Sequence, residues 1–348
     1  MFQNFLHDVP FVVQCLIAAA AAMVIGVLLG APMRRLGVRL NIMDVPNRRS
    51  SHTRTVPRTG GVAIVLAMLV AAVLFGKLSP ALLVAVGLGA VAGVISFIDD
   101  TISLPSVPRL LVHLTVAGIG IYWIGLQPAG LELPYATIPF SPWFGVVFAA
   151  VVVTAFVNFF NFMDGINGIA ISQGVVGGAT LAILLAACGA SNSAIVAAAL
   201  VGGCLGFLPY NFPRAVMFMG DMGSTTIGLA LAMMTLLGAK HWPWVACLMP
   251  LGVFIYDAIF TVVKRLLRRE NILKAHREHH YQLLIRSGWS HVRVTSLQFG
   301  LMLLCGGAAL VYAWADDHLA RLIVLLVLLT VFVTYSVLVH RHFARHGT

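Results

Sequence analysis

The stretch Asn158-Phe-Phe-Asn161-Phe-Met-Asp164-Gly-Ile-Asn167-Gly-Ile-Ala170 decides how this chain folds, because it lies between two long apolar runs. One run covers residues 143–157, the other begins near residue 171, and both have the character of membrane spans. A carboxylate so close to hydrocarbon costs about 3 kcal/mol, so Asp164 marks a functional site. Asn158, Asn161 and Asp164 follow one another at intervals of three residues, and a continuous helix would place them on one face.

The composition indicates an integral membrane protein. Of 348 residues, 60% are hydrophobic and only 10% are charged, whereas about a quarter of the residues in soluble domains are charged. A helix needs about 20 apolar residues to cross about 30 Å of hydrocarbon. Eleven segments qualify, near 10–30, 60–76, 80–98, 108–126, 143–160, 169–188, 193–210, 222–238, 243–264, 294–314 and 319–340. We therefore predict an all-α polytopic bundle of ten or eleven transmembrane helices, forming a single domain over residues 1–348.

The positive charges favour one orientation, because cytoplasmic loops are enriched in Lys and Arg. With the N-terminus in the periplasm and the C-terminus in the cytoplasm, nineteen of the 22 Lys and Arg residues fall in cytoplasmic segments. The net charge of +10 reflects this bias and needs no nucleic-acid partner. The loops expected to form an active site on the cytoplasmic side are 31–59, 99–108, 161–168, 211–221 and 265–293.

The first of these loops combines cations with turn-forming residues. Pro57 restricts the backbone and Gly60-Gly61 permits a sharp turn, so the amides at the start of the next helix are expected to face the cytoplasm. Arginine side chains match phosphate oxygens, which favours a polyphosphate-binding loop over charge that only fixes orientation. The candidate substrate-binding side chains in this loop are Asn47, Arg48, His52 and Arg58.

Further carboxylates occur at or inside other spans. Asp99 and Asp100 end one span, where the helix dipole and mutual repulsion disfavour them, so we interpret the pair as binding a cation or transferring protons. Asp221 precedes another span and is a candidate metal ligand, although capping of that helix is an alternative role. Asp257 lies inside a span, where we expect it to pair with a polar group on a neighbouring helix in a supporting role.

Histidines gather in the last long loop, in the stretch His276-Arg277-Glu278-His279-His280-Tyr281-Gln282. A helical continuation of the preceding span would place His276, His279 and His280 on one face. Zinc binding is one interpretation, but no acidic ligand accompanies the rings, so contact with a pyrophosphate is favoured. The final segment, His340–His346, is expected to do no more than meet lipid headgroups.

Five motifs occur in order and on one side of the membrane: Asp44-x-Pro46-Asn47…His52-x4-Pro57-x2-Gly60-Gly61, Phe97-Ile-Asp99-Asp100, Asn158-x2-Asn161-x2-Asp164-Gly-x-Asn167-Gly-x-Ala170, Gly220-Asp221-x-Gly223-Ser224 and the histidine-rich loop. In these motifs the chain closely resembles the polyprenyl-phosphate N-acetylhexosamine-1-phosphate transferases. The resemblance implies transfer of a sugar-1-phosphate from a UDP-N-acetyl sugar to undecaprenyl phosphate, with release of UMP, at the cytoplasmic face of a bacterial inner membrane. It also implies a requirement for Mg²⁺, with Mn²⁺ as a substitute, and leaves a homodimer open.

The resemblance further assigns roles to individual residues. The catalytic residues would be Asp99, Asp100, His279 and His280, with the two histidines contacting the diphosphate. Asp221 would be the principal metal ligand, assisted by Asp100 or Asp164. The substrate-binding residues would include Asn158, Asn161, Asp164 and Arg277.

Two positions depart from the pattern of this family. Asn167 stands where many members carry Asp, so it cannot supply an essential carboxylate. Arg277 replaces a histidine of the final motif, which puts His276 out of register. The first and last loops most resemble those of O-antigen-initiating members that act on N-acetylated 6-deoxyhexoses such as FucNAc or QuiNAc, and a GlcNAc-1-phosphate-specific member is the alternative.

Two questions stay open at the level of sequence. Asp99 could remove a residual proton from the lipid phosphate in a single displacement, or an aspartyl-phosphate intermediate could give a double displacement. A secondary transporter would also carry intramembrane carboxylates. It would place them at the bilayer midplane within inverted repeats, and no repeat is visible in this sequence.

Overall fold

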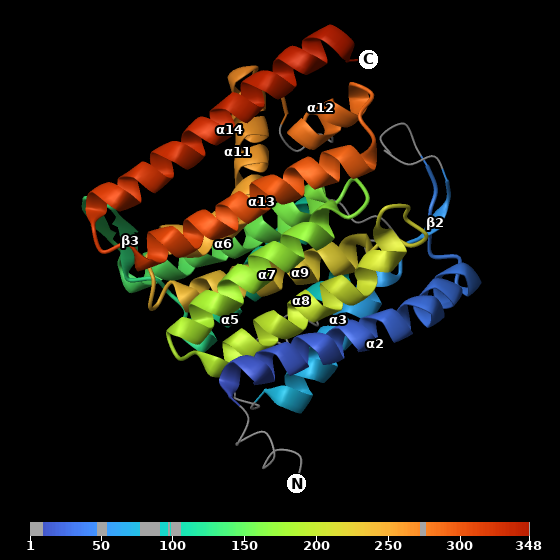
Figure 1. Ribbon diagram of the computed structural model, residues 1–348, viewed down its shortest axis with the longest axis horizontal. Helices are drawn as coiled ribbons and strands as arrows, with labels where there is room; N and C mark the ends of the chain where they lie inside the picture. The colour runs from blue at the N-terminus through green and yellow to red at the C-terminus, as the bar shows by residue number, and fades with distance from the viewer. Residues whose placement is uncertain are drawn as a thin grey trace.

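The computed structural model describes residues 10–46, 54–76, 91–96, 98, 106–271 and 276–347, and these are mostly helical. Long helices lie side by side across the molecule (Figure 1). They are α2 (Phe11–Arg39), α3 (Gly60–Phe75), α5 (Ser106–Ile124), α6 (Pro142–Met163), α7 (Ile169–Ala187), α8 (Ser191–Asn211), α9 (Gly220–Gly238), α11 (Gly252–Leu267), α13 (His291–Trp314) and α14 (His318–His346). The shorter helices are α10 (Trp244–Leu248), the 3₁₀-helix η1 (Met249–Leu251) and α12 (His280–Arg286).

Seven helical stretches among the described residues are long and apolar enough to cross a membrane. They are Phe11–Arg39, Pro142–Met163, Ile169–Ala187, Ser191–Asn211, Trp244–Leu267, His291–Trp314 and His318–His346. The prediction of a polytopic helical membrane protein is thereby confirmed. Helices also cover three more of the expected segments, as α3, α5 and α9, and residues 91–96 are helical. The larger number of spans and the direction of the termini stay predictions.

Two features of the backbone differ from the expectation. Helix α2 continues to Arg39, with Pro32 inside it, so the first loop begins later than residue 31. The all-α prediction also missed two small antiparallel sheets. In one, β1 (Met43–Asp44) pairs with β2 (Val56–Pro57), and in the other, β3 (Gly130–Leu133) pairs with β4 (Ala136–Pro139). Strands of two to four residues are too short to give a periodic pattern in the sequence.

The core of the bundle lies around α7 and α8, which are the two most deeply buried of the candidate spans. Small residues make this packing possible, because they let helix backbones approach closely where lipid provides little driving force. On α8, a Cβ at Gly202 or Gly206 would overlap the backbone carbonyls of Ala19 or Met23 on α2. The first span is therefore fitted against the core.

Hydrogen bonds join the connecting segments at one end of the bundle. Phe218 N donates to Pro57 O at 2.8 Å, Asn167 Nδ2 donates to Pro213 O at 3.1 Å, and Tyr281 Oη donates to Phe162 O at 2.9 Å. We call this the loop end, comprising residues 41–46, 54–59, 164–168, 212–219, 268–271 and 276–290. In Figure 1, β2 and α12 lie on the right at this end, and β3 lies at the opposite side.

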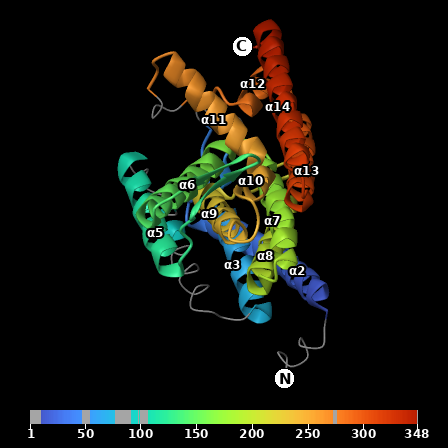
Figure 2. The same cartoon turned by 90° about the vertical axis from the view of Figure 1, so that its left-hand side faces the viewer.

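One span is broken and then turns away from its neighbours. Helix α10 passes through η1, which contains Pro250, before α11 begins at Gly252. Proline interrupts a helix because it lacks an N–H donor, and Gln173 of α7 donates from Nε2 to Pro250 O at 2.8 Å at this break. Figure 2 shows α11 leaning away from α13 and α14 as it leaves the bundle.

The starts of α3 and α9 meet backbone to backbone. Gly60 N donates to Phe218 O and Gly61 N donates to Met219 O, each at 2.9 Å. A Cβ at Gly61 would overlap the backbone N of Gly223 and lie 2.6 Å from Met219 O. The two glycines are therefore required by a close helix contact.

Substitution of Gly61 by Ala tests this contact. We expect Gly61→Ala to lower the free energy of unfolding by about 1–3 kcal/mol, because the added methyl must push backbone aside. The control is Gly300→Ala on α13, where an added Cβ meets no atom within 4 Å. Thermal unfolding of both variants in detergent is the measurement. Equal midpoints for Gly61→Ala and the wild type would contradict the close contact.

Candidate functional site

The turn after α6 separates Asp164 from the helix that precedes it. Helix α6 ends at Met163, and Asp164 has left helical geometry, with φ −83° and ψ 52°. The prediction that Asn158, Asn161 and Asp164 share one helix face is therefore wrong for Asp164, which lies beyond the helix. Asn158 Nδ2 donates to Thr154 O of its own helix at 2.7 Å, and Asn161 is half-buried one turn before Asp164.

The next residues of this turn are held by three separate elements. Asn167 Nδ2 donates to Pro213 O, Thr295 Oγ1 of α13 donates to Asn167 O at 2.7 Å, and Gly168 N donates to Asn211 Oδ1 at 2.6 Å. A carboxylate at residue 167 could not donate to Pro213. The side chain of Asn167 thus joins the turn after α6 to the segment that contains Pro213. This contact needs a donor, which explains an amide rather than a carboxylate at this position.

Asp221 lies in the first turn of α9 and does not cap it. The helix begins at Gly220, its N-cap residue is Met219, and no side chain caps it. The alternative capping role for Asp221 is therefore wrong. Its side chain is half-buried at the loop end. A carboxylate is electrostatically favoured there, because helix N-termini carry partial positive charge.

Asp164 and Asp221 lie at the same end of two packed helices. The helices cross where a Cβ at Gly228 of α9 would come within 3.2 Å of Val157 and Phe160 of α6. Asp221 precedes this crossing by seven residues, or about 10 Å of helix, and Asp164 follows it by a similar length. Asn167 donates to Pro213 O in the segment that leads into α9, and Gly168 donates to Asn211 at the end of α8, so the turn that carries Asp164 lies against the segment that precedes Asp221.

Asp99 and Asp100 lie outside the described residues, so their predicted catalytic roles are untested. The described helix just before them packs on the first turns of α9. Ser96 Oγ donates to Thr225 Oγ1 at 2.9 Å, and a Cβ at Gly93 would contact Thr226. This segment therefore approaches the same helix that carries Asp221.

The first loop does not offer free helix amides to an anion. The amides of Gly60 and Gly61 donate to Phe218 O and Met219 O, so the expectation that these two amides could bind an anion is wrong. Arg58 is half-buried, and its backbone N donates to Ile42 O at 3.2 Å. The other predicted ligands of this loop, Asn47, Arg48 and His52, lie outside the described residues.

Asp257 is the centre of a buried polar cluster. It is 2% exposed in α11, and its oxygens contact His279 Nδ1 at 3.2 Å, His280 Nδ1 at 3.1 Å and the His280 backbone N at 3.0 and 3.1 Å. Thr261 Oγ1 donates to the same carboxylate at 3.3 Å. The expectation that Asp257 pairs with polar groups is confirmed, and the partners are the two histidines of the last loop.

The two histidines differ in what they can reach. His280 is fully buried, and its Nε2 contacts Ser336 Oγ of α14 at 2.9 Å, so both ring nitrogens are occupied inside the protein. Ser336 Oγ in turn contacts Tyr256 Oη at 2.8 Å. Among the described residues, the ring of His279 is held at Nδ1, and it lies among the rings of Phe162, His276 and Tyr281. Both rings are buried, His279 at 3% exposure, and the predicted contact of the two histidines with a diphosphate stays a prediction.

The predicted helical face of three histidines does not form. Helix α12 begins at His280, with His279 as its N-cap, so His276 lies outside the helix. No group of three or more metal-ligating His, Cys, Asp or Glu side chains occurs among the described residues. Arg277 is half-buried beside these rings, and Arg286 Nη1 donates to its carbonyl at 3.2 Å.

Tyr281 fixes the histidine loop over the turn that carries Asp164. Besides its bond to Phe162 O, its hydroxyl accepts from Gln282 Nε2 at 3.1 Å, and it lies so close to Gly165 that no Cβ would fit there. Burial raises the pKa of Tyr281 well above its ordinary value, so the hydroxyl stays protonated and can donate. The predicted substrate-binding loops 161–168 and 265–293 are therefore in direct contact.

A charge cluster that the sequence analysis did not identify holds the start of this loop. Arg265 is 5% exposed, and its guanidinium contacts Glu278 at 2.7 Å and Glu270 at 3.0 Å. Arg268 also reaches Glu278 at 3.3 Å. A buried arginine requires paired carboxylates, because leaving it unpaired costs several kcal/mol. This pairing fixes the loop on both sides of residues 272–275.

The C-terminal helix does more than meet lipid headgroups. Lys264 Nζ donates to His340 Nε2 at 2.7 Å, and Trp289 Nε1 donates to His342 Nε2 at 3.0 Å. Arg286 lies over the ring of Phe343, with 4.7 Å between the guanidinium carbon and the ring centroid. These contacts dock α14 on α11 and α12, and the earlier interpretation of this segment is corrected accordingly.

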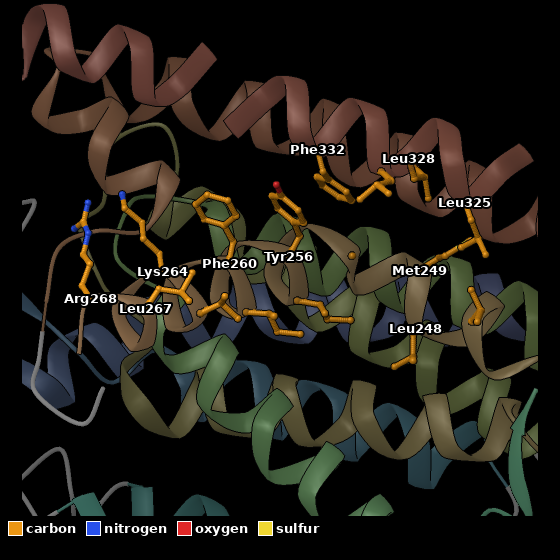
Figure 3. A pocket seen from close by; sticks show the side chains of 16 residues that line it. Leu248, Met249, Tyr256, Phe260, Lys264, Leu267, Arg268, Leu325, Leu328 and Phe332 are labelled. Carbon is orange, nitrogen blue, oxygen red and sulfur yellow. The ribbon is translucent and has the colours of Figure 1, made fainter. Parts of the chain in front are cut away.

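An elongated pocket of about 850 Å³ lies between α11 and α14. Its lining is almost entirely apolar and includes Leu248, Met249, Ile259, Leu325, Leu329 and Phe332. Figure 3 shows Lys264 and Arg268 together at one end, while Leu248 and Leu325 lie at the other. The pocket thus suits a long apolar molecule with an anionic group at one end.

The sequence is similar to a family of transferases and to several of its members. The model of glycosyl transferase family 4 matches residues 82–239. The chain is 30% identical over 357 residues to a phospho-N-acetylmuramoyl-pentapeptide-transferase of Mycolicibacterium vanbaalenii, covering 86% of this chain and 97% of the relative. It is 29% identical over 265 residues to a protein of Bacillus subtilis described as a probable undecaprenyl-phosphate N-acetylglucosaminyl 1-phosphate transferase, covering 74% of each chain. It is also 29% identical over 303 residues to a decaprenyl-phosphate N-acetylglucosaminephosphotransferase of Mycobacterium tuberculosis, covering 76% of this chain and 74% of the relative.

His276 gives the histidine loop a predictable response to acid. Burial, with repulsion from His279 and Arg265, lowers the pKa of His276 from 6.5 to about 4. As the pH decreases from 6.5 to 4, the unfolded chain therefore takes up a proton that the folded loop does not. The free energy of unfolding decreases as the pH decreases through that window. We expect the thermal midpoint of His276→Gln to fall less than that of the wild type between pH 7 and pH 5. The control is His346→Gln at the exposed end of α14, and equal slopes for His276→Gln and the wild type would contradict the assignment.

Proposed function

This chain belongs to glycosyl transferase family 4, the family of polyprenyl-phosphate hexosamine-1-phosphate transferases, and from that premise we propose the reaction it catalyses. It transfers an N-acetylhexosamine-1-phosphate from a UDP-sugar to undecaprenyl phosphate and releases UMP. The product starts an O-antigen or another cell-envelope glycan. The observation that carries this proposal is the apolar pocket between α11 and α14 with two cations at one end.

The pocket has the chemistry of a polyprenyl phosphate site. A polyprenyl chain is long and apolar, and its single phosphate is anionic, which matches the distribution of side chains in Figure 3. Lys264 and Arg268 are accompanied by Arg265 and Arg269, against only Glu270 and Glu278 in the adjoining cluster. This end of the pocket is therefore net positive.

The pocket also adjoins the histidine cluster. Tyr256 and Phe260 line it, and their rings lie 6.0 and 4.9 Å from the ring of His280, centroid to centroid. Tyr256 is joined to His280 through Ser336. A lipid phosphate at the cationic end would thus be near the loop that is expected to contact the donor diphosphate.

The carboxylates at the loop end suit a divalent cation. Magnesium is usually held by one or two carboxylates together with substrate phosphates and waters, and half-buried Asp164 and Asp221 supply two carboxylates at one end of α6 and α9. We propose that Asp221, with Asp164 or Asp100, holds Mg²⁺, with Mn²⁺ as a substitute. A bound ion would reduce the repulsion between the two phosphorylated substrates and polarise the attacked phosphorus.

The side chains of the protein would orient the reactants. We propose that Asn161 and Arg277 bind the donor, with Asn47, Arg48, His52 and Arg58 of the first loop, and that His279 contacts its diphosphate. Asp99 would accept the residual proton of the lipid phosphate in a single displacement. Nothing in this scheme requires a second chain, and a homodimer remains a proposal. The loop end would face the cytoplasm of the bacterial inner membrane, where positively charged loops concentrate.

The identity of the sugar is proposed only as a class. The names of two relatives specify N-acetylglucosamine and that of a third specifies an N-acetylmuramoyl pentapeptide, whereas the first and last loops resemble members that act on 6-deoxyhexosamines. All of these sugars carry an N-acetyl group. The relatives favour UDP-GlcNAc, and the loops favour UDP-FucNAc or UDP-QuiNAc.

A donor panel tests the function. We expect purified protein to release UMP from at least one UDP-N-acetyl sugar only when undecaprenyl phosphate and Mg²⁺ are both present. UMP release should disappear with a chelator and return with Mn²⁺. Failure with every UDP-N-acetyl sugar, or equal release without lipid, would contradict the proposal.

A labelled donor distinguishes the two displacement schemes. A donor labelled with ³²P in the phosphate next to the sugar, offered without lipid, would label the protein only in a double displacement.

A bulky side chain in the pocket should weaken the lipid substrate selectively. Leu329 of α14 lines the pocket and is 55% exposed, so Leu329→Trp fills space with little disturbance of the core. We expect KM for undecaprenyl phosphate to rise about tenfold, which corresponds to about 1.4 kcal/mol, with KM for the UDP-sugar unchanged. Leu338→Trp, on the same helix but outside the pocket lining, is the matched control. Equal effects of both variants, or a rise in KM for the sugar donor, would show that this pocket does not hold the lipid.

A further inference from the structure

The cluster around Asp257 contains more hydrogen-bond donors than a simple helix cap requires. A cap for α12 needs only the contact with the His280 backbone N, which both carboxylate oxygens make. The same carboxylate also receives the side chains of His279, His280 and Thr261. The additional contacts fix the orientation of two imidazole rings in a site that is nearly inaccessible to solvent.

The chemistry of a carboxylate determines the state of each ring. An ionised carboxylate only accepts hydrogen bonds, so a hydrogen bond from Nδ1 of His279 or His280 to Asp257 requires the hydrogen on that nitrogen, and we assign this form to both rings. In a neutral ring the lone pair then lies on Nε2, because one nitrogen donates and the other accepts. His280 Nε2 is already engaged by Ser336. Among the described residues His279 Nε2 has no such contact, so it is the nitrogen of this pair that we assign to a substrate.

We infer that Asp257 is a positioning residue for His279 in the transfer reaction. It holds the ring with Nδ1–H inward and directs Nε2 to the loop end, where the neutral nitrogen accepts a proton or, once protonated, donates to a phosphate oxygen. Asp257 touches neither substrate and acts through His279. The inference rests on the proposed function, because His279 is expected to contact the donor diphosphate.

The surroundings of the cluster support a fixed ring. The rings of Phe162, His276 and Tyr281 lie around His279, at centroid distances of 6.4, 5.0 and 6.1 Å. The backbone N of His279 donates to Gln282 Oε1 at 3.2 Å, and Tyr281 ties the loop to Phe162 O. The backbone and ring of His279 are thus restrained by residues of α6, α11 and α12. A catalytic imidazole needs such a fixed orientation, whereas a histidine in a surface loop does not.

Nitrogen NMR tests the assignment directly. In the wild-type protein labelled with ¹⁵N-histidine, we expect His279 to show the Nδ1–H form, with Nε2 unprotonated, at neutral pH. In Asp257→Asn, an uncharged and weaker acceptor replaces the carboxylate, so the share of that form should fall. The UMP-release assay should then show kcat reduced about 10- to 100-fold, as is typical when an outer partner of a functional histidine is lost.

A matched variant separates positioning from packing. Ser336→Ala removes a buried hydrogen bond from the same network but leaves the contact between Asp257 and His279 intact. We expect it to lower the thermal midpoint, to preserve the Nδ1–H form of His279 and to keep kcat close to that of the wild type.

Three results would overturn the inference. One is a wild-type spectrum in which His279 carries its hydrogen on Nε2. This result would contradict the assigned form of the ring even if the Asp257→Asn protein does not fold. The second is an Asp257→Asn protein whose His279 form and kcat match the wild type. The third is a loss of stability in Asp257→Asn without a change in the His279 form, which would reduce Asp257 to a helix cap. Absence of UMP release by the wild type with every donor would instead contradict the proposed function, and the spectrum would still report on the ring.

Discussion

A single buried carboxylate joins the membrane-spanning part of this protein to its polar end. Asp257 lies in α11, ten residues before that helix ends, where an unpaired acid would cost several kcal/mol. The contacts that satisfy it come from His279 and His280, so the loop must fold back onto α11 for the helix to be stable there. Through Ser336 the same cluster reaches α14, and through Tyr281 the loop reaches the turn that carries Asp164.

Buried and half-buried charges have different roles in this arrangement. Asp257 and Arg265 are almost fully buried and are surrounded by partners, as buried charges that hold other side chains in place must be. Asp164 and Asp221 are half-buried at the loop end, where a cation and phosphates can approach. In the same way, the apolar pocket carries its cations at one end only. In the proposed reaction, the lipid phosphate would bind at the cations and the metal-bound diphosphate at the half-buried carboxylates.

Much of this was predictable from particular residues. The apolar runs predicted the helices, and Asp164, Asp221 and the histidine loop were identified as parts of one end because each follows or precedes a run. Predictions from sequence spacing were wrong at residues whose conformation is decided by tertiary contacts. The amides of Gly60 and Gly61 were expected to bind an anion, but they are used by the segment before α9. His276, His279 and His280 were expected on one helix face, but the helix starts at His280, where Asp257 accepts from its first backbone N.

Other features carried no readable signal. Ser336 is one small polar residue in a long apolar helix, and only its contact with His280 gives it meaning. Asn211 belongs to none of the five motifs, although it accepts from Gly168 N and also donates to Met217 O. The pairing of Arg265 with Glu278 depends on a chain reversal that local propensity does not specify.

We propose that carboxylates from separate membrane helices hold one divalent ion against the diphosphate of the donor. Electron paramagnetic resonance of Mn²⁺ added to the purified protein with UDP-GlcNAc or UDP-FucNAc measures this directly. We expect bound Mn²⁺ with a ³¹P coupling from the donor. This coupling should be lost in Asp221→Asn and retained in Asp316→Asn, which changes an exposed acid outside the loop end. An unchanged ³¹P coupling in Asp221→Asn would contradict the claim.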